Sequence, residues 1–169
     1  MLLSNYVIFI PCLSVSGSQA FGDGRQGGFH IFQIYSMQKI EHIGIAVKSF
    51  SASLPIFEKL LNCPYYKTEF VENEKVNTAF FQQGETKIEL LESADTNGII
   101  SRFIEKKGEG IHHIAFEVTD IEAEIGRLKK EGFILLNEAP KKGADNKLVC
   151  FLHPKSSNGV LIELCQEIK

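Results

Sequence analysis

The sequence has no excess of basic residues, no long hydrophobic run and no paired cysteines, and each absence removes a class of function. The formal net charge is −3 over 169 residues. This balance leaves no basic face for a phosphate backbone, so nucleic acid is not an expected partner. The apolar stretch at residues 6–13 is far too short for a bilayer span, which needs about 20 residues. No membrane partner is expected either.

The four cysteines are widely separated, and none belongs to a C-x-x-C pair. Cys150 and Cys165 lie in strand-like apolar runs and are most simply small core residues in a reducing compartment. A disulfide between these two stays open from the sequence, although no feature calls for one. We therefore expect a cytoplasmic protein.

Residues 1–36 stand apart from the rest of the chain. Arg25 is their only arginine and they have no lysine, whereas a secretory signal needs a basic start and a mitochondrial presequence needs several arginines. A G-x-G-x-x-G match at residues 22–27 has neither a strand before it nor a helix after it, so it does not indicate a nucleotide site. We expect residues 1–36 to be a disordered or dispensable leader, with a cleaved signal as the alternative. Residues 37–169 should form one domain.

The domain is organised around a repeated stretch that carries histidine. Residues 110–118 read GIHHIAFEV and residues 41–47 read EHIGIAV, which aligns His42 with His113 at an offset of 113 − 42 = 71. Each stretch is followed later by an apolar strand with one glutamate, and these two glutamates are offset by 163 − 89 = 74. The repeat predicts two fused modules with a four-residue site between them.

Each module follows the order βαβββ, as judged from apolar alternation in strands and helical spacing of apolar residues. The first module has strands at 39–47, 65–71, 77–82 and 86–91, and a helix at 50–61 that Ser49 or Ser51 can cap. The second has strands at 111–118, 133–136, 148–152 and 160–164, a helix at 121–130 and a polar loop at 139–146. A short amphipathic helix is expected in the connector 95–110. The predicted fold class is α+β: two modules, about 38–92 and 111–166, forming a curled, cup-shaped mixed sheet around a metal site.

The repeated histidines and glutamates suit a metal ion. An unpaired carboxylate inside a sheet cup costs several kcal/mol, so a buried glutamate needs a cation. Two imidazoles and two carboxylates form a mixed nitrogen and oxygen set for Zn²⁺, Co²⁺, Ni²⁺ or Mn²⁺, with positions left for water or substrate. The candidate ligands are His42, Glu89, His113 and Glu163.

The sequence from about residue 38 to 167 resembles the vicinal-oxygen-chelate superfamily of glyoxalases and dioxygenases, and within it the methylmalonyl-CoA epimerases. The resemblance is carried by IEHIGIAV at 40–47, TKIELL at 86–91, GIHHIAF at 110–116 and FLHPKSSNGVLIEL at 151–164. The double histidine and the last stretch are fairly specific to the epimerases. The spacing of histidine and glutamate is shared by the whole superfamily.

The resemblance implies a divalent metal, Co²⁺ first and Zn²⁺, Mn²⁺ or Ni²⁺ otherwise, held by the four candidate ligands. It implies a CoA thioester substrate that chelates the metal, and proton removal and return at C2 through an enolate. Glu163 and Glu89 would then be ligands that also act as bases, one for each face. His112 and Lys155 are candidate substrate contacts; His112 could equally support a ligand or face the helices. A homodimer is expected.

One departure from the family leaves the second base open. Some epimerases have glutamine at the position of Glu89 and a glutamate in the preceding strand, but no carboxylate stands near Thr78 here. A lactoylglutathione lyase of the glyoxalase I type is the alternative enzyme, although module one lacks arginines for the two glutathione carboxylates. A ring-cleaving dioxygenase would need only one glutamate. A non-catalytic binding protein of the same superfamily should lack some ligands.

Overall fold

The computed structural model describes residues 37–169, and the predicted leader at residues 1–36 lies outside the described residues. The described part contains eight strands and three α-helices. In chain order these are β1 (Ile40–Val47), α1 (Phe50–Leu61), β2 (Lys67–Val71), β3 (Val76–Gln83), β4 (Thr86–Ser93), α2 (Ile99–Lys107), β5 (Gly110–Glu117), α3 (Ile121–Lys130), β6 (Lys141–Lys142), β7 (Lys147–Leu152) and β8 (Ile162–Glu167).

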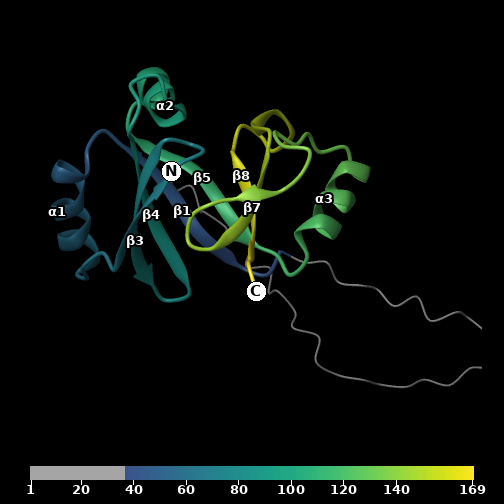
Figure 1. Ribbon diagram of the computed structural model, residues 1–169, viewed down its shortest axis with the longest axis horizontal. Coiled ribbons are helices and arrows are strands. Elements are labelled where there is room, and N and C mark those ends of the chain that lie inside the picture. The colour runs from purple at the N-terminus through teal and green to yellow at the C-terminus, as the bar shows by residue number, and fades with distance from the viewer. Residues whose placement is uncertain (1–36) are drawn as a thin grey trace, which may run out of the picture. The chain divides into compact units, whose positions relative to one another are not determined.

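All eight strands belong to one mixed sheet in the order β2-β3-β4-β1-β5-β8-β7-β6. Outward from the centre, the first module contributes β1, β4, β3 and β2, and the second contributes β5, β8, β7 and β6. The two modules meet at the antiparallel pair β1–β5, while β1–β4 and β5–β8 are parallel. The predicted α+β class and the curled mixed sheet are confirmed (Figure 1).

Helix α1 covers the outer face of the first module. It begins at Phe50 because the Ser49 hydroxyl accepts a hydrogen bond from the Ala52 N–H at 3.3 Å. Its apolar stripe, which includes Leu54 and Phe57, packs on the buried side chains of β3 and β4. The bounds of this helix match those predicted from the sequence.

Helix α3 covers the outer face of the second module in the same way. The Asp120 carboxylate accepts from the Ala123 N–H at 3.0 Å and caps its start. Ile121, Ile125 and Leu128 pack against the apolar side chains of β7 and β8. In Figure 1, α1 and α3 lie at opposite ends of the described part, and α2 stands above the strands at the top of the view.

Because side chains alternate along a strand, those that do not pack toward α1 or α3 point to the inner face of the sheet. On β4, Ile88 and Leu90 pack toward α1, so Glu89 between them points to the inner face. On β8, Ile162 and Leu164 pack toward α3, and Glu163 points inward for the same reason. The outer helices therefore orient both carboxylates.

The structure corrects one strand of the second module. Residues 133–136 form a single bridge, Leu135 to Leu152, instead of the predicted strand. Phe133 and Leu135 do pack on the core beside α3, which accounts for the apolar run. The outer strand is the two-residue β6, Lys141–Lys142, inside the segment predicted as a polar loop. Within residues 37–169, no helix combines the length and hydrophobicity needed to cross a bilayer.

Candidate functional site

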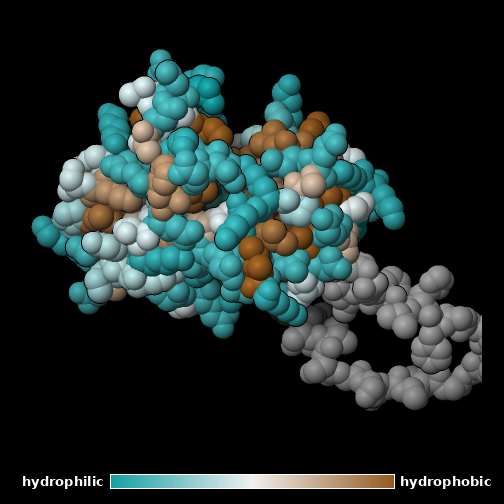
Figure 2. Space-filling view, viewed as in Figure 1, coloured by the Kyte–Doolittle hydropathy of each residue, from teal (hydrophilic) through white to brown (hydrophobic). Residues whose placement is uncertain are grey.

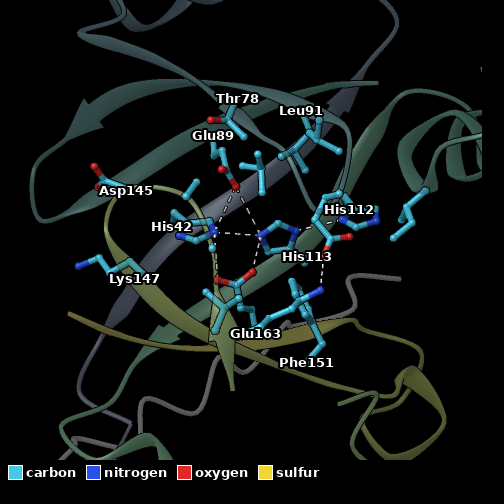
Figure 3. A pocket seen from close by; sticks show the side chains of 18 of the residues that line it. His42, Thr78, Glu89, Leu91, His112, His113, Asp145, Lys147, Phe151 and Glu163 are labelled. Carbon is cyan, nitrogen blue, oxygen red and sulfur yellow. Dashed lines mark hydrogen bonds and ion pairs between the residues drawn. The ribbon is translucent and has the colours of Figure 1, made fainter. Parts of the chain in front are cut away.

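Four adjacent central strands each place one of the candidate ligands on the inner face of the sheet. Glu89 comes from β4, His42 from β1, His113 from β5 and Glu163 from β8, and all four side chains are buried. In Figure 3 the two imidazoles lie side by side, with Glu89 on one side of the pair and Glu163 on the other. The structure thus brings together residues up to 121 positions apart (163 − 42).

The distances describe a compact cluster. The Nε2 atoms of His42 and His113 are 2.9 Å apart. Glu89 Oε2 lies 3.3 Å from His42 Nε2 and 3.6 Å from His113 Nε2. Glu163 places Oε1 at 3.9 Å from His42 Nε2 and Oε2 at 3.4 Å from His113 Nε2. The ligand atoms of His42, His113 and Glu163 all lie within 4.8 Å of one another, and Glu89 stands beside this set of three.

The other ring nitrogens show what the cluster can bind. The Glu41 carboxylate accepts from His42 Nδ1 at 2.6 Å, so the hydrogen of a neutral His42 is on Nδ1. His113 Nδ1 lies 3.0 Å from His112 Nδ1. If His113 donates there, both Nε2 lone pairs face each other between two carboxylates. This arrangement requires a cation, and the mixed donor set fits a divalent metal ion.

Burial and neighbouring charges raise the pKa values of three members of the cluster. Burial alone would lower the pKa of His42, but Glu89, Glu41 and Glu163 outweigh it and raise that pKa to about 9. Burial raises the pKa of Glu163 to about 8, and repulsion from Glu89 adds to it. Burial also raises the pKa of Glu89. Without a metal, a proton on His42 therefore serves as the cation at neutral pH.

His113 is the neutral member of the imidazole pair. Burial, with the charge of His42 as the next cause, lowers the pKa of His113 well below its usual value. Burial likewise lowers the pKa of His112 to about 4. His112 also packs edge-on against Phe103 of α2, with ring centroids 4.9 Å apart. A neutral His112 can accept a hydrogen bond from His113, which a charged one cannot.

A network of alternating charges lies behind His42. The Glu41 carboxylate, which binds His42, also binds Lys87 and lies 3.5 Å from Lys147. Lys87 in turn donates to Asp145 at 2.6 Å. Burial opposes the shift, but hydrogen bonds from His42 and Lys87 hold the pKa of Glu41 at about 2. Glu41 therefore stays ionised. Asp145 belongs to the loop before β7, so this network joins the second module to the first.

The cluster lies in a cavity of about 280 Å³. The cavity walls are mostly apolar, and His112 is among the residues that line them. Two of the lining residues, Ile99 and Leu136, are 45% and 52% exposed, which places them at the rim. Figure 2 shows hydrophobic surface between α2 and the loops of the second module, besides further hydrophobic patches on the same face. Lys155 is exposed and is not part of the lining.

The sequence reasoning missed the residues that support the site. Glu41, Lys87, Lys147 and Asp145 were not singled out as residues of the site. One signal was present: Glu41 precedes His42 as His112 precedes His113, at the same offset of 112 − 41 = 71. The lysines and Asp145 gave no comparable signal, because their pairing depends on how strands from both modules meet.

Comparison with known proteins gives a consistent set of relatives. Residues 41–151 match the Glyoxalase/Bleomycin resistance protein/Dioxygenase superfamily. The chain is 39% identical to the uncharacterized protein YqjC of Bacillus subtilis (strain 168), over 77% of this chain and 93% of that one. It is 34% identical to the mitochondrial methylmalonyl-CoA epimerase of Homo sapiens, over 79% of this chain and 76% of that one.

A solved structure extends the likeness to a ligand complex. The fold matches a variant of Streptomyces coelicolor methylmalonyl-CoA epimerase in complex with 2-nitronate-propionyl-CoA, with a TM-score of 0.73 and 30% identity. The match covers 78% of this chain and 96% of that one. The similarity therefore extends over nearly the whole of that protein.

Proposed function

The chain belongs to the glyoxalase/bleomycin resistance protein/dioxygenase superfamily, and from that premise we propose that it is an epimerase that interconverts (2R)- and (2S)-methylmalonyl-CoA. One observation carries the proposal. Two buried carboxylates, Glu89 and Glu163, lie on opposite sides of a pair of imidazoles in one apolar cavity (Figure 3). Epimerisation needs a base on each face of C2, and this arrangement can supply both. The named epimerases among the relatives support the same reaction.

His42, His113, Glu89 and Glu163 are the residues that would hold a divalent metal ion. When bound, such an ion would supply Lewis acidity toward the thioester carbonyl oxygen, where negative charge develops as the C2 proton leaves. The donor set accepts Co²⁺, Zn²⁺, Mn²⁺ or Ni²⁺. Co²⁺ is the ion that the resemblance to the epimerases favours, and it is the first to be tested.

Glu163 and Glu89 would move the proton at C2. One carboxylate removes the proton from one face of an enolisable C2, and the other returns a proton to the opposite face. Burial raises the pKa of both carboxyls, which improves them as bases near neutral pH. Glu163 is the first choice for one base. Glu89 is the choice for the other, since Thr78 on β3 carries no carboxylate.

The cavity would bind the acyl part of the substrate and exclude water from it. Its walls include Val76, Leu91 and Phe151, which suit an alkyl group at C2. His112 lines the cavity and could contact the substrate carboxylate. Lys155 is exposed, so it would meet only a distant part of a long ligand such as a CoA phosphate.

Two further properties complete the proposal. Cys63, Cys150 and Cys165, the cysteines within the described residues, are free thiols and fit the reducing environment of the cytoplasm.

The protein would act as a homodimer, as expected from the resemblance. Light scattering of the purified protein would measure its mass in solution, and a mass near the 18.9 kDa of one chain would contradict the dimer.

The test uses the purified full-length protein, stripped with a chelator and reloaded with Co²⁺. Each epimer of methylmalonyl-CoA is incubated in D₂O, and deuterium uptake at C2 and conversion to the other epimer are followed by NMR and chiral chromatography. Both should be rapid and metal-dependent. Glu92→Gln should leave both unchanged, because Glu92 lies on the same strand as Glu89 but its carboxylate accepts from the Phe50 N–H.

The same preparation is also tested with the hemithioacetal of methylglyoxal and glutathione. Isomerisation of that compound without exchange at C2 of methylmalonyl-CoA would favour the glyoxalase I type of reaction and overturn the proposal. Metal binding without turnover of either compound would favour a binding protein.

A further inference from the structure

The two central strands carry matching β-bulges next to the site. Glu41 on β1 and His112 on β5 have no pairing partner across the β1–β5 ladder, so each is an extra residue in its strand. Each lies directly before one imidazole of the cluster. The Glu41 bulge lies between the pairs Ile40↔Phe116 and His42↔Ala115. The His112 bulge lies between the pairs Gly44↔His113 and Ile45↔Ile111.

The bulges explain how two consecutive side chains of one strand can both face the cavity. In a regular strand, successive side chains point to opposite faces, so Glu41 and His42 would be separated by the sheet. A bulge re-aims the extra side chain toward the same face as its neighbour. Glu41, His42, His112 and His113 all line the cavity as a result.

Each bulge residue contacts the ring nitrogen that faces away from the cluster. Glu41 Oε2 is 2.6 Å from His42 Nδ1, and His112 Nδ1 is 3.0 Å from His113 Nδ1. Both contacts leave the Nε2 atoms directed at each other and at the two glutamates. Position 41 and position 112 therefore do the same structural task in the two modules.

The two partners differ in chemistry. Glu41 is a carboxylate held by Lys87 and close to Lys147, so its orientation is fixed from behind. Lys87 is itself bound to Asp145. His112 is an imidazole that packs edge-on against Phe103, and no charged side chain is among its hydrogen-bond partners within the described residues. A hydrogen bond to a carboxylate is stronger than one to a neutral nitrogen, and it makes the imidazole a better electron donor.

We propose that Glu41 and His112 are paired positioning residues that aim the two imidazoles at the metal, with Glu41 acting the more strongly. Glu41 keeps the hydrogen of His42 on Nδ1 and leaves Nε2 free to bind the ion. His112 does the same for His113 through a weaker, uncharged contact. This inference rests on the metal-binding part of the proposed function, but it does not depend on the identity of the substrate.

The loss of such a supporting partner typically weakens metal binding by about 10- to 100-fold. Glu41→Leu should lie at the upper end of this range, because it removes the acceptor and leaves Lys87 and Lys147 without their shared anion. Glu41→Gln should recover part of the loss, since its amide oxygen can still accept from Nδ1. His112→Leu should cost less, about 10-fold.

The matched control is Glu167→Gln. Glu167 binds Lys147 in the same charge network but makes no contact with either imidazole. The change from glutamate to glutamine is the same as at Glu41, so a loss of affinity that comes only from removing an acidic partner of Lys147 would appear in this variant too. The Co²⁺ dissociation constant of Glu167→Gln should stay within about threefold of that of the parent protein.

Two measurements test the proposal on the full-length protein. Titration of the chelator-treated protein with Co²⁺, followed by absorption and chelator competition, gives the dissociation constants. NMR of the metal-free protein with ¹⁵N-labelled histidine detects the downfield proton on His42 Nδ1 that a hydrogen bond to Glu41 produces. That signal should be present in the parent and Glu167→Gln, weaker in Glu41→Gln and absent in Glu41→Leu.

The outcomes separate this inference from the epimerase proposal. Affinity in Glu41→Leu within threefold of the parent, or an unchanged Nδ1 signal, would overturn it, whether or not the protein epimerises methylmalonyl-CoA. If the leucine variant does not fold, Glu41→Gln decides by the same two readings. Failure of the parent to turn over substrate while the affinity series holds would remove the epimerase proposal alone.

Discussion

The imidazole of His113 lies directly against the backbone of Gly44, its pairing partner on β1. A Cβ added at Gly44 would be 2.3 Å from His113 Cε1 and 2.8 Å from its Nε2. No side chain fits there without moving the ring. The glycine in the first repeated stretch is therefore part of the site, although it offers no chemical group of its own.

Gly44→Ala should move the His113 ring away from the cluster. We expect Co²⁺ affinity to fall by at least about 10-fold, as for other losses of ligand orientation. The free energy of unfolding should fall by about 1–3 kcal/mol, because the added methyl group overpacks a buried site. Metal titration and urea denaturation measure the two effects.

Gly126→Ala is the control for this substitution. A Cβ at Gly126 in α3 meets no atom within 4 Å. It should leave metal affinity unchanged and stabilise the protein by about 0.5–1 kcal/mol, because alanine is a better helix former than glycine. Equal loss of metal affinity in both variants would show that the effect of Gly44→Ala is not local to the site.

Metal affinity should depend steeply on pH. His42, with its pKa raised to about 9, carries a proton in the metal-free protein at neutral pH, and the ion must displace it. Affinity should therefore rise about tenfold per pH unit for each proton released, and level off above about pH 9. Calorimetry in buffers with different ionisation enthalpies counts the protons. An affinity that is constant from pH 6 to 9 would contradict the assigned charge of His42.

The metal-free protein should lose stability as the pH rises from 5 to 9. The pKa of His42 is about 9 in the folded protein, against an ordinary value of 6.5. Its contribution to the free energy of unfolding is therefore complete below pH 6.5 and is lost as the pH rises through 9. Glu163 has a folded pKa of about 8 against 4.5, so ionisation above 4.5 favours the unfolded chain. The urea midpoint in the presence of a chelator should fall over this range. With saturating Co²⁺ the fall should be much smaller, since the ion replaces the proton.

The repeat made the main features of this fold accessible from sequence. The 71-residue offset between His42 and His113 predicted that equivalent strands would meet, and these strands are the central pair β1 and β5. Helical spacing gave the bounds of α1, because one side of that helix packs on a sheet throughout its length. The apolar strands that hold Glu89 and Glu163 predicted that both carboxylates would be buried in the sheet cup, as they are.

Other features depend on contacts between distant segments and could not be predicted. The bulges at Glu41 and His112 are register shifts between two strands, so neither strand reveals them alone. Asp145 reaches Lys87 across the module boundary from a loop that the sequence marks only as polar. Residues 133–136 show the opposite case, because an apolar run that packs on a core need not pair as a strand.

A chain that begins at Met37 should fold and bind metal like the full-length protein. The described residues 37–169 by themselves form an eight-stranded sheet that holds every residue assigned to the site. Met37 itself packs on the core beside α3, so a start at this residue keeps that contact. The melting temperature and Co²⁺ affinity of the two chains should agree. A shortened chain that fails to fold would show that residues 1–36 contribute to stability.

The final prediction concerns the proton at C2. Glu163→Gln keeps an oxygen ligand but removes a base, so the protein should still bind Co²⁺ while epimerisation falls by about 10²–10⁴-fold. Glu89→Gln is the sharper test, because this side chain has been assigned two roles that the variant separates. If Glu89 is the base for one face, exchange of the C2 proton should become one-sided.

Deuterium uptake is therefore followed separately from each epimer in D₂O. In Glu89→Gln we expect one epimer to exchange at a rate close to that of the parent and the other to exchange slowly, with little conversion between them. Glu92→Gln on the same strand is the control and should exchange both epimers normally, since its carboxylate binds Phe50 and Asn77. Symmetric exchange at the normal rate in Glu89→Gln would leave Glu89 as a ligand only. The second proton transfer would then have to come from a water molecule or another residue of the cavity.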